Sequence, residues 1–284
     1  MYLLNHQGMV KAEATIANLP NGRVWYGSAA ASEFHDMDWL IQHLRPDEDV
    51  RIRSLTNDQT ILVLAGPKAR DVLSAAARGD WSSEAFPWLG VRETHIGIAP
   101  AIVMGVSFSG ELAYEIHIPN SSLQAAYDSL RKAGEPYGLT LFGSRAVESM
   151  RLEMGYLHWK SDILTEFDPF ETGLDQFVAL EKADFVGREA LLKRTKEGKR
   201  KQLVTLSLDC THAPVHPGAS VRSNGEIIGT VTSGDWGHRT GLNLAYAFVT
   251  PGASDLSIDV LGEEVPAEII PAGPYQAKIT NRNP

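Results

Sequence analysis

One stretch, SFSGELAYEIHI at residues 107–118, decides how the first two thirds of this chain are interpreted. In its second half, Tyr114 and Ile116 alternate with Glu115. A period of two is typical of a strand with one face buried, and it puts Glu115 on the face opposite Tyr114. A carboxylate inside an apolar strand costs desolvation free energy unless it meets donors. Two interpretations of Glu115 therefore stay open: a side chain solvated on an edge strand, or a functional group.

Mixed helix and strand signals surround this stretch. The segments 9–19 and 23–27 are extended and flank Pro20-Asn21-Gly22, which predicts a hairpin. Apolar residues at helical spacing and local capping residues predict further helices. These helices are expected after Ser32, after Gly66-Pro67, from Asn120 or Ser121 to Leu130, over 144–154 and over 188–194.

The pattern changes after the charged run at residues 193–201, which we interpret as a solvated linker and a domain boundary. Short alternating runs follow at 203–208, 227–232 and 256–261, separated by turn signals such as Asn224-Gly225. This spacing predicts a small antiparallel barrel or sandwich without further helices.

Composition narrows the class of protein. The 284 residues are 43% hydrophobic and 21% charged, as in a globular protein. A formal charge of −9 disfavours binding to nucleic acid or to anionic membranes. No apolar run approaches the roughly 18 residues of a membrane span, the N-terminus lacks a leader pattern, and the single cysteine, Cys210, forms no internal disulfide. We therefore expect a cytoplasmic protein without a membrane anchor.

The common catalytic motifs are missing from the sequence. It contains no dinucleotide fingerprint, P-loop, nucleophile elbow or zincin motif. His212 and His216 are four residues apart, but Pro214 and Pro217 exclude a helical metal pair, so we interpret them as loop histidines and expect no metal site. Glu148 and Arg151 are three residues apart on a predicted helix, where a surface ion pair is the default interpretation.

Five short motifs in order resemble the aminomethyltransferase family, which includes the glycine-cleavage T-protein and the folate domains of dimethylglycine and sarcosine dehydrogenases. The dehydrogenase-type members look most similar. The motifs are LAGPKAR at 64–70, SGELAYE at 109–115, SMRLEMG at 149–155, DFVGREAL at 184–191 and GTVTSG at 229–234.

The resemblance implies an α+β fold with two domains. Residues 1–197 would form a folate-binding aminomethyltransferase-like domain, short at its N-terminus compared with relatives, and residues 198–284 a C-terminal antiparallel β-barrel domain. The implied cofactor is tetrahydrofolate. The implied function is one-carbon transfer, aminomethyl or methyl, from a small methylated amine or related donor.

The resemblance also implies a set of site residues. Glu115 matches the family's strand glutamate and would accept N–H donors of the pterin. Glu13 follows the first glycine turn, where relatives usually carry Asp, and is the candidate catalytic carboxylate. Phe108 stands where relatives often have Tyr, and together with Tyr114 and Arg145 it completes the expected cofactor contacts. The alternative for Glu13 is an exposed hairpin glutamate.

A second function stays open beside the transferase. The chain could be a non-catalytic folate-binding or structural subunit that partners a separate flavin-dependent N-methyl amine dehydrogenase. The short N-terminal part and the exchanges at Glu13 and Phe108 motivate this alternative, so we leave enzymatic activity undecided. A flavoprotein subunit and a second copy of the chain are the candidate protein partners.

Overall fold

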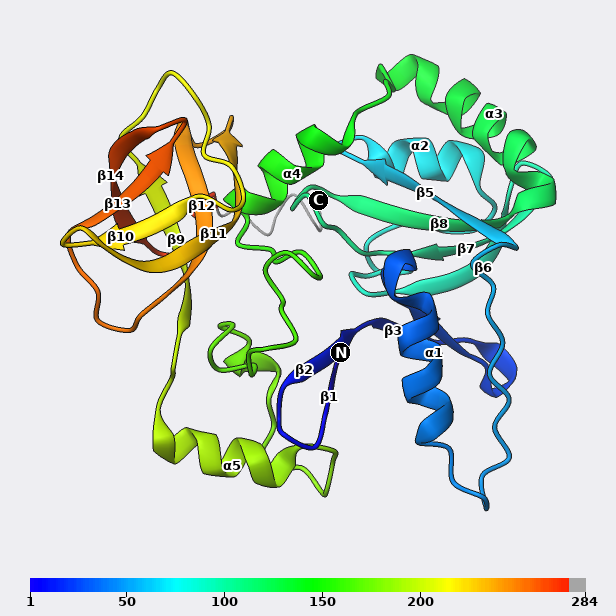
Figure 1. The fold of residues 1–284 in the computed structure, drawn as a ribbon. Helices are drawn as coiled ribbons and strands as arrows, with labels where there is room; N and C mark the ends of the chain where they lie inside the picture. The colour runs from blue at the N-terminus through cyan, green and yellow to red at the C-terminus, as the bar shows by residue number, and fades with distance from the viewer. Residues whose placement is uncertain (276–284) are drawn as a thin grey trace. The chain divides into compact units, whose positions relative to one another are not determined.

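The computed structural model describes residues 1–275 and contains a mixture of helices and antiparallel strands (Figure 1). Two compact units are present. One comprises residues 1–13 and 144–275, and the other comprises residues 14–143. The first thirteen residues therefore belong with the C-terminal half of the chain. The α+β class with a C-terminal barrel is confirmed.

The unit of residues 14–143 is built on a four-stranded antiparallel sheet in the order β5-β8-β7-β6. Its strands are β5 (Gln59–Ala65), β6 (Val91–Ile96), β7 (Ala99–Met104) and β8 (Ala113–Pro119). Two helices, α2 (Ala69–Ala76) and α3 (Leu123–Gly134), cover one face of the sheet (Figure 1). Val72 and Leu73 of α2 are buried there, as their helical spacing predicts.

A hairpin and a helix precede this sheet in the same unit. They are β3 (Thr15–Asn18), β4 (Val24–Gly27) and α1 (Glu33–Gln42), and single 3-10 turns lie at Pro20–Gly22, Ala30–Ser32, Asn120–Ser122 and Glu135–Tyr137. The predicted hairpin is confirmed. The predicted single segment at 9–19 is wrong, because the chain is divided at Ala14. The residues before Ala14 pair with the N-terminal strand, whereas those after it pair with β4.

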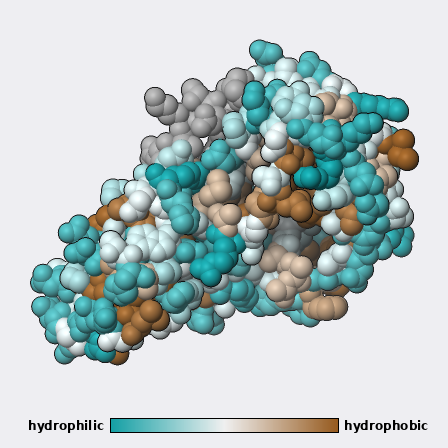
Figure 2. Space-filling model, turned by 90° about the horizontal axis from the view of Figure 1, so that it is seen from above, coloured by the Kyte–Doolittle hydropathy of each residue, from teal (hydrophilic) through white to brown (hydrophobic). Residues whose placement is uncertain are grey.

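Helix α1 forms where the apolar spacing predicts it, yet its apolar side chains are largely outside. Phe34 is 82% exposed and Ile41 is 53% exposed. The buried residue is Asp36, whose carboxylate accepts a hydrogen bond from the Tyr26 hydroxyl at 3.5 Å and lies 2.9 Å from His35 Nδ1. Figure 2 shows hydrophobic residues among hydrophilic ones on the face of the molecule seen from above.

The other unit begins with an N-terminal pair of strands, β1 (Tyr2–Leu4) and β2 (Val10–Glu13). Later in the chain it contains α4 (Ser144–Glu153), a 3-10 turn at Asp175–Phe177 and α5 (Arg188–Glu197). Leu4 and Val10 pack with Leu191 of α5 and with Ile163 of the irregular segment between the two helices. This cluster explains why the N-terminal strands join the C-terminal half of the chain.

A closed six-stranded antiparallel barrel completes this unit, in the order β10-β11-β12-β9-β14-β13. Its strands are β9 (Gln202–Leu208), β10 (Ser220–Ser223), β11 (Glu226–Gly237), β12 (Leu242–Val249), β13 (Leu256–Val260) and β14 (Glu263–Ile270). Asn224 and Gly225 connect β10 to β11 with φ angles of 50° and 82°, which is the backbone that a tight hairpin requires. The barrel domain predicted for residues 198–284 extends to residues 276–284, which lie outside the described residues.

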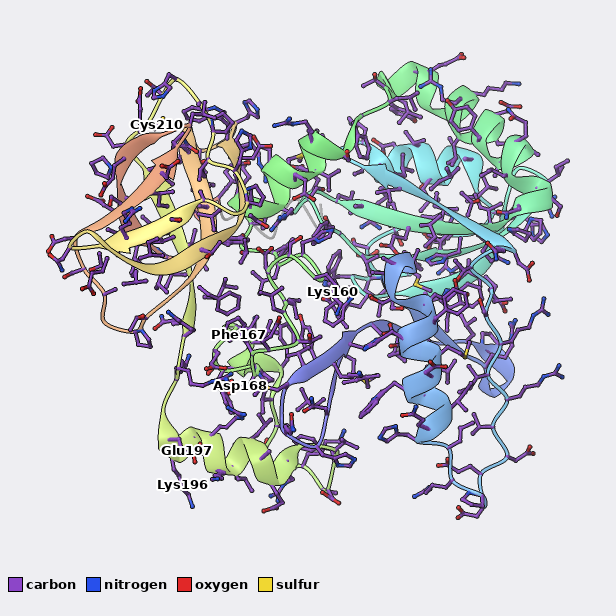
Figure 3. All side chains as sticks on the ribbon, in the orientation of Figure 1. Lys160, Phe167, Asp168, Lys196, Glu197 and Cys210 are labelled. Carbon is purple, nitrogen blue, oxygen red and sulfur yellow. The ribbon has the colours of Figure 1, made fainter. Side chains whose placement is uncertain are left out.

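The charged run at residues 193–201 is not a solvated linker throughout. Lys196 and Glu197 form the last turn of α5 (Figure 3). Arg200 donates to the buried carboxylate of Glu171, from Nε at 2.9 Å and from Nη2 at 2.7 Å. The prediction of a solvated linker is therefore wrong for Arg200. Its buried acidic partner, Glu171, lies far away in sequence, so the local run of charges gave no sign of it.

Candidate functional site

Glu115 lies on β8, an interior strand of the four-stranded sheet. On the same face it is directly opposite Val63 of β5 and Met104 of β7. Because β8 has a neighbour on both sides, the edge-strand interpretation of Glu115 is wrong. The Glu115 side chain is nevertheless 37% exposed. A carboxylate is therefore accessible on a rigid strand between two apolar side chains.

The two faces of β8 have different environments. Tyr114 and Ile116 point to the helix-covered face and belong to the core packed against α2 and α3. Tyr114 is only 2% exposed. The expectation that Tyr114 binds the same ligand as Glu115 is therefore corrected, because adjacent strand residues point to opposite faces.

His117 shares the face of Glu115 and was missed by the sequence analysis. It is 4% exposed, and its Nε2 atom lies 3.4 Å from Glu115 Oε2. The edge of its ring meets the Trp25 ring, with centroids 5.6 Å apart and planes at 89°. The available signal was the spacing of two residues along the strand, which places His117 beside Glu115.

Phe108 lies in the loop between β7 and β8. Gly110 turns this loop with a φ of 81°, and its N–H donates to the Ser107 hydroxyl at 3.0 Å. Phe108 is 38% exposed, so part of its ring is accessible. The loop leads directly into the strand that carries Glu115.

Glu13 belongs to the other unit, at the end of β2. It pairs with Tyr2 across the strands, and the Tyr2 hydroxyl donates to Glu13 Oε1 at 3.3 Å. Burial raises the pKa of Glu13, and this effect outweighs the hydrogen bond from Tyr2 and the attraction of the N-terminus and His158, which lower it. Glu13 is thus a half-buried carboxyl group whose pKa lies above its ordinary value, unlike the exposed hairpin glutamate considered above.

Arg145 lies in the first turn of helix α4 and lines a shallow depression of about 300 Å³ on the unit of residues 1–13 and 144–275. Its side chain is 79% exposed, and its Nη2 lies 3.6 Å from Asp235 Oδ2. His158 and Ser161 line the same depression. The depression combines a cationic side chain with groups that can donate or accept hydrogen bonds.

Arg151 forms the floor of this depression and is not part of a surface ion pair. Its side chain is 2% exposed, and Nη1 donates to the fully buried Asp162 at 2.7 Å. Nη2 donates to Glu148 at 2.7 Å and to Ser233 at 2.6 Å. The predicted pairing of Glu148 with Arg151 is confirmed. Glu148 is 39% exposed, but the surface location is wrong for Arg151, which is buried and also donates to Ser233 of the barrel.

Glu153, on the same helix, is a buried carboxylate whose two oxygens both accept hydrogen bonds from protein groups. We call such a carboxylate saturated. Its Oε2 accepts from Arg239 Nε at 2.6 Å, and its Oε1 accepts from the N–H groups of Arg239 and Thr240, each at 2.7 Å. All these contacts connect α4 to the loop after β11. A structural role for Arg151 and Glu153 therefore agrees with their contacts.

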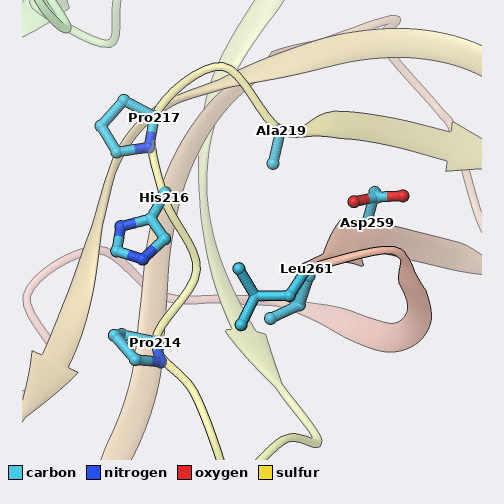
Figure 4. Close-up of a pocket in the computed structure, with 7 residues that line it drawn as sticks. Pro214, His216, Pro217, Ala219, Asp259 and Leu261 are labelled. Atoms are coloured by element: carbon cyan, nitrogen blue, oxygen red, sulfur yellow. The ribbon is translucent and has the colours of Figure 1, made fainter.

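The barrel loop carries two histidines. His216 stands between Pro214 and Pro217 beside a depression of about 260 Å³ (Figure 4), and it also lines the depression that contains Arg145 and Arg151. His212 lies next to Cys210, with 3.5 Å between Nδ1 and Sγ, and it also approaches Glu263 at 3.5 Å. Within residues 1–275, no group of three or more His, Cys, Asp and Glu side chains could hold a metal ion.

None of the helices formed by residues 1–275 combines the length and the hydropathy that crossing a bilayer requires.

Comparison with known proteins identifies the family. Residues 1–182 match the GCVT N-terminal domain, and residues 201–276 match the glycine cleavage T-protein C-terminal barrel domain. The chain is 30% identical over 275 residues to mitochondrial dimethylglycine dehydrogenase of Homo sapiens, covering 95% of this chain and 32% of that protein. It is also 30% identical over 285 residues to the mitochondrial pyruvate dehydrogenase phosphatase regulatory subunit of Mus musculus. This alignment covers 98% of this chain and 32% of that protein.

A solved structure shows the same fold. The glycine cleavage system aminomethyltransferase T from Bartonella henselae superposes with a TM-score of 0.84 at 23% identity, covering 96% of this chain and 74% of that one. The chain spans about a third of the length of the curated relatives it matches. With both of its domains matched in order, this chain belongs to the glycine cleavage T-protein family of aminomethyltransferases.

Proposed function

We propose that this chain binds tetrahydrofolate and transfers a one-carbon unit, aminomethyl or methyl, to it from a small amine or a related donor. Family membership supports the reaction class. The observation that carries the proposal is the half-exposed Glu115 carboxylate on an interior strand of the sheet. In this proposal the folate-binding part comprises residues 1–197 and the barrel comprises residues 198–284.

The residues around Glu115 fit a reduced pterin. The pyrimidine edge of a pterin presents adjacent N–H donors, and one carboxylate can accept two of them. Val63, which is 51% exposed beside Glu115, offers apolar surface against which a flat ring can pack. Phe108, on the loop before β8, would add an aromatic contact. This combination of one polar anchor and apolar walls is typical of cofactor sites.

Each proposed residue has a defined task. Glu115 binds and orients the cofactor, and Arg145 contributes a cationic contact to the ligand. Glu13, whose pKa is raised by burial, is the proposed catalytic carboxylate, because a raised pKa lets a carboxyl group keep a proton at a higher pH than an ordinary glutamate. Tetrahydrofolate, when bound, supplies the nucleophilic nitrogen that receives the one-carbon unit. Tyr114 is left out of this set because it faces the core.

A second candidate function has its own support. One relative is named a regulatory subunit, although it aligns with nearly the whole chain. The alternative is therefore a non-catalytic folate-binding or structural subunit that partners a separate flavin-dependent N-methyl amine dehydrogenase. Tetrahydrofolate binding without any transfer from dimethylglycine or sarcosine, alone or with such a flavoprotein, would favour this alternative.

The test is anaerobic calorimetric titration of the purified chain with tetrahydrofolate, beside the Glu115→Gln variant. Removing a charged acceptor from a hydrogen bond costs on the order of 1 to 3 kcal/mol, so we expect affinity to fall about 5- to 150-fold. Glu93→Gln is the matched control, since Glu93 lies on β6 of the same sheet with a 41% exposed side chain. This control should bind like the unmodified chain.

Two results would overturn the proposal. One is the absence of tetrahydrofolate binding by the unmodified, folded chain. The other is an affinity of Glu115→Gln within about twofold of the original, because loss of a carboxylate that accepts pterin N–H donors should lower the affinity by more than that. Thermal melts of all three proteins establish that each one is folded.

A further inference from the structure

His117 is a buried imidazole that lies beside the proposed cofactor anchor. Its Nε2 atom is 3.4 Å from Glu115 Oε2, within ion-pair distance. This nitrogen is buried and makes no hydrogen bond of good geometry. Buried polar atoms in folded proteins nearly always have a hydrogen-bond partner, so an incompletely satisfied nitrogen points to a role outside packing.

The surroundings of His117 limit where its ring can go. Directly opposite on the neighbouring strands lie Ile61 of β5 and Ile102 of β7. The edge of the imidazole also contacts the Trp25 ring. Apolar groups therefore lie against the imidazole, and the Glu115 carboxylate, which can accept a hydrogen bond, is within its reach.

We propose that His117 is a positioning residue that holds one oxygen of Glu115, so that the other oxygen faces the cofactor. This inference rests on the proposed function. In an apolar environment a hydrogen bond from an imidazole N–H to a carboxylate is stronger than in water. A hydrogen bond from His117 Nε2 to Oε2, once formed, would fix the side-chain rotamer of Glu115. A carboxylate that is already oriented binds its ligand without a further loss of rotamer freedom.

Packing alone would predict a different pattern of variants. If His117 only fills space, Phe is the better replacement, because it retains the ring volume and the contact with Trp25. If His117 positions Glu115, Gln is the better replacement, because its amide keeps an N–H donor. The ligand affinities of the two variants should therefore rank in opposite order under the two interpretations.

The experiment measures tetrahydrofolate affinity by calorimetry for His117→Phe and His117→Gln, each in the unmodified chain and in the Glu115→Gln background. We expect His117→Phe to weaken binding about 5- to 20-fold and His117→Gln to restore affinity to within about threefold of the original. In the Glu115→Gln background, His117→Phe should change affinity less than twofold, because its effect passes through the carboxylate. His95→Phe, at an exposed position on β6, is the matched control and should not change affinity.

The outcomes separate this inference from the proposed function. If the unmodified chain binds and Glu115→Gln weakens binding, but His117→Phe binds normally, the positioning role is wrong and the proposed function stands. Equal losses in both backgrounds also reject the positioning role. If the unmodified chain does not bind tetrahydrofolate at all, the proposed function itself fails. Thermal melts identify a variant that has lost its fold, and His117→Gln then decides the question.

Discussion

Three carboxylates of the unit of residues 1–13 and 144–275 are more completely satisfied by protein partners than Glu115 of the other unit. Asp162, Glu153 and Glu171 are buried, and each one accepts hydrogen bonds from an arginine and from backbone N–H groups. Glu115 is half exposed, and its Oε2 lies 3.4 Å from Nε2 of His117. A carboxylate with all its partners supplied by the protein stabilises the fold, whereas one with free acceptor capacity on a rigid strand is available to a ligand.

This comparison makes a direct claim about variants. Removing a partner from a saturated network should lower the free energy of unfolding and affect ligands only through the fold. Removing the charge of Glu115 should weaken ligand binding and leave the free energy of unfolding almost unchanged. The four predictions below test that claim, from the largest expected effect on stability to the smallest.

Replacement of Arg151 should have the largest effect. Arg151→Met leaves the fully buried carboxylate of Asp162 without its cation, and breaking a buried ion pair in this way costs about 3 to 5 kcal/mol. Urea denaturation at neutral pH measures the loss. Arg145→Met, at the exposed end of the same helix, is the control and should unfold like the original chain. A loss below about 1 kcal/mol for Arg151→Met would contradict the structural role of the network.

Replacement of Glu171 should have a smaller effect that depends on pH. Burial alone would raise its pKa, but hydrogen bonds from the Arg200 side chain and from backbone N–H groups, together with the charge of Arg200, lower the pKa below its ordinary value of 4.5. The folded state therefore favours the charged form, and this contribution to stability is complete above pH 4.5 and lost as pH falls through the lowered pKa.

We expect Glu171→Gln to lose about 1 to 3 kcal/mol at pH 7, as for hydrogen bonds to a charged group. The difference from the original chain should shrink as the pH of the urea series is lowered below about 4. A constant difference between pH 7 and pH 3 would show that the charge of Glu171 does not contribute.

Replacement of Glu13 should have a small effect of opposite sign. Its raised pKa means that the folded state favours the protonated form, so the contribution of Glu13 to stability is complete below pH 4.5 and is lost as pH rises through the raised pKa. Glu13→Gln mimics the protonated form and should raise the melting temperature at pH 7 by about 1 °C, a few tenths of a kcal/mol. Below pH 4 the two proteins should melt together. A lower melting temperature at pH 7 would mean that the charge of Glu13 stabilises the fold.

Replacement of Glu115 should have almost no effect on stability. Glu115→Gln keeps the shape of a half-exposed side chain, so the free energy of unfolding should change by less than about 0.5 kcal/mol. Urea denaturation without ligand is the measurement. A loss of 2 kcal/mol or more would place Glu115 with the saturated carboxylates and would remove the physical basis for assigning it to ligand binding.

Local features of this protein were predictable from the sequence. The alternation of residues predicted that Glu115 and Tyr114 point to different faces of one strand, and Asn224-Gly225 predicted a hairpin of the barrel. Both features were predictable because side-chain direction and turn geometry depend on a few neighbouring residues. The helical spacing from Phe34 to Ile41 likewise predicted α1, although not which side of it faces solvent.

Burial was not predictable in the same way. Arg151 was expected at the surface, yet barrel strands more than 80 residues away cover it and supply the Ser233 hydroxyl. The run at 9–19 was expected to be one segment, yet it contributes strands to two different sheets. In both cases the deciding partners lie far along the chain, and sequence spacing carries no information about them.

The sequence by itself therefore determined the strand that carries Glu115, the side on which its carboxylate emerges and the family to which the chain belongs. Only the tertiary structure decided that β8 is an interior strand, that His117 is buried against Glu115 and that Arg151 is a core residue. The physical reason is that side-chain direction is set by local backbone geometry, whereas burial and charge satisfaction depend on segments brought together by folding.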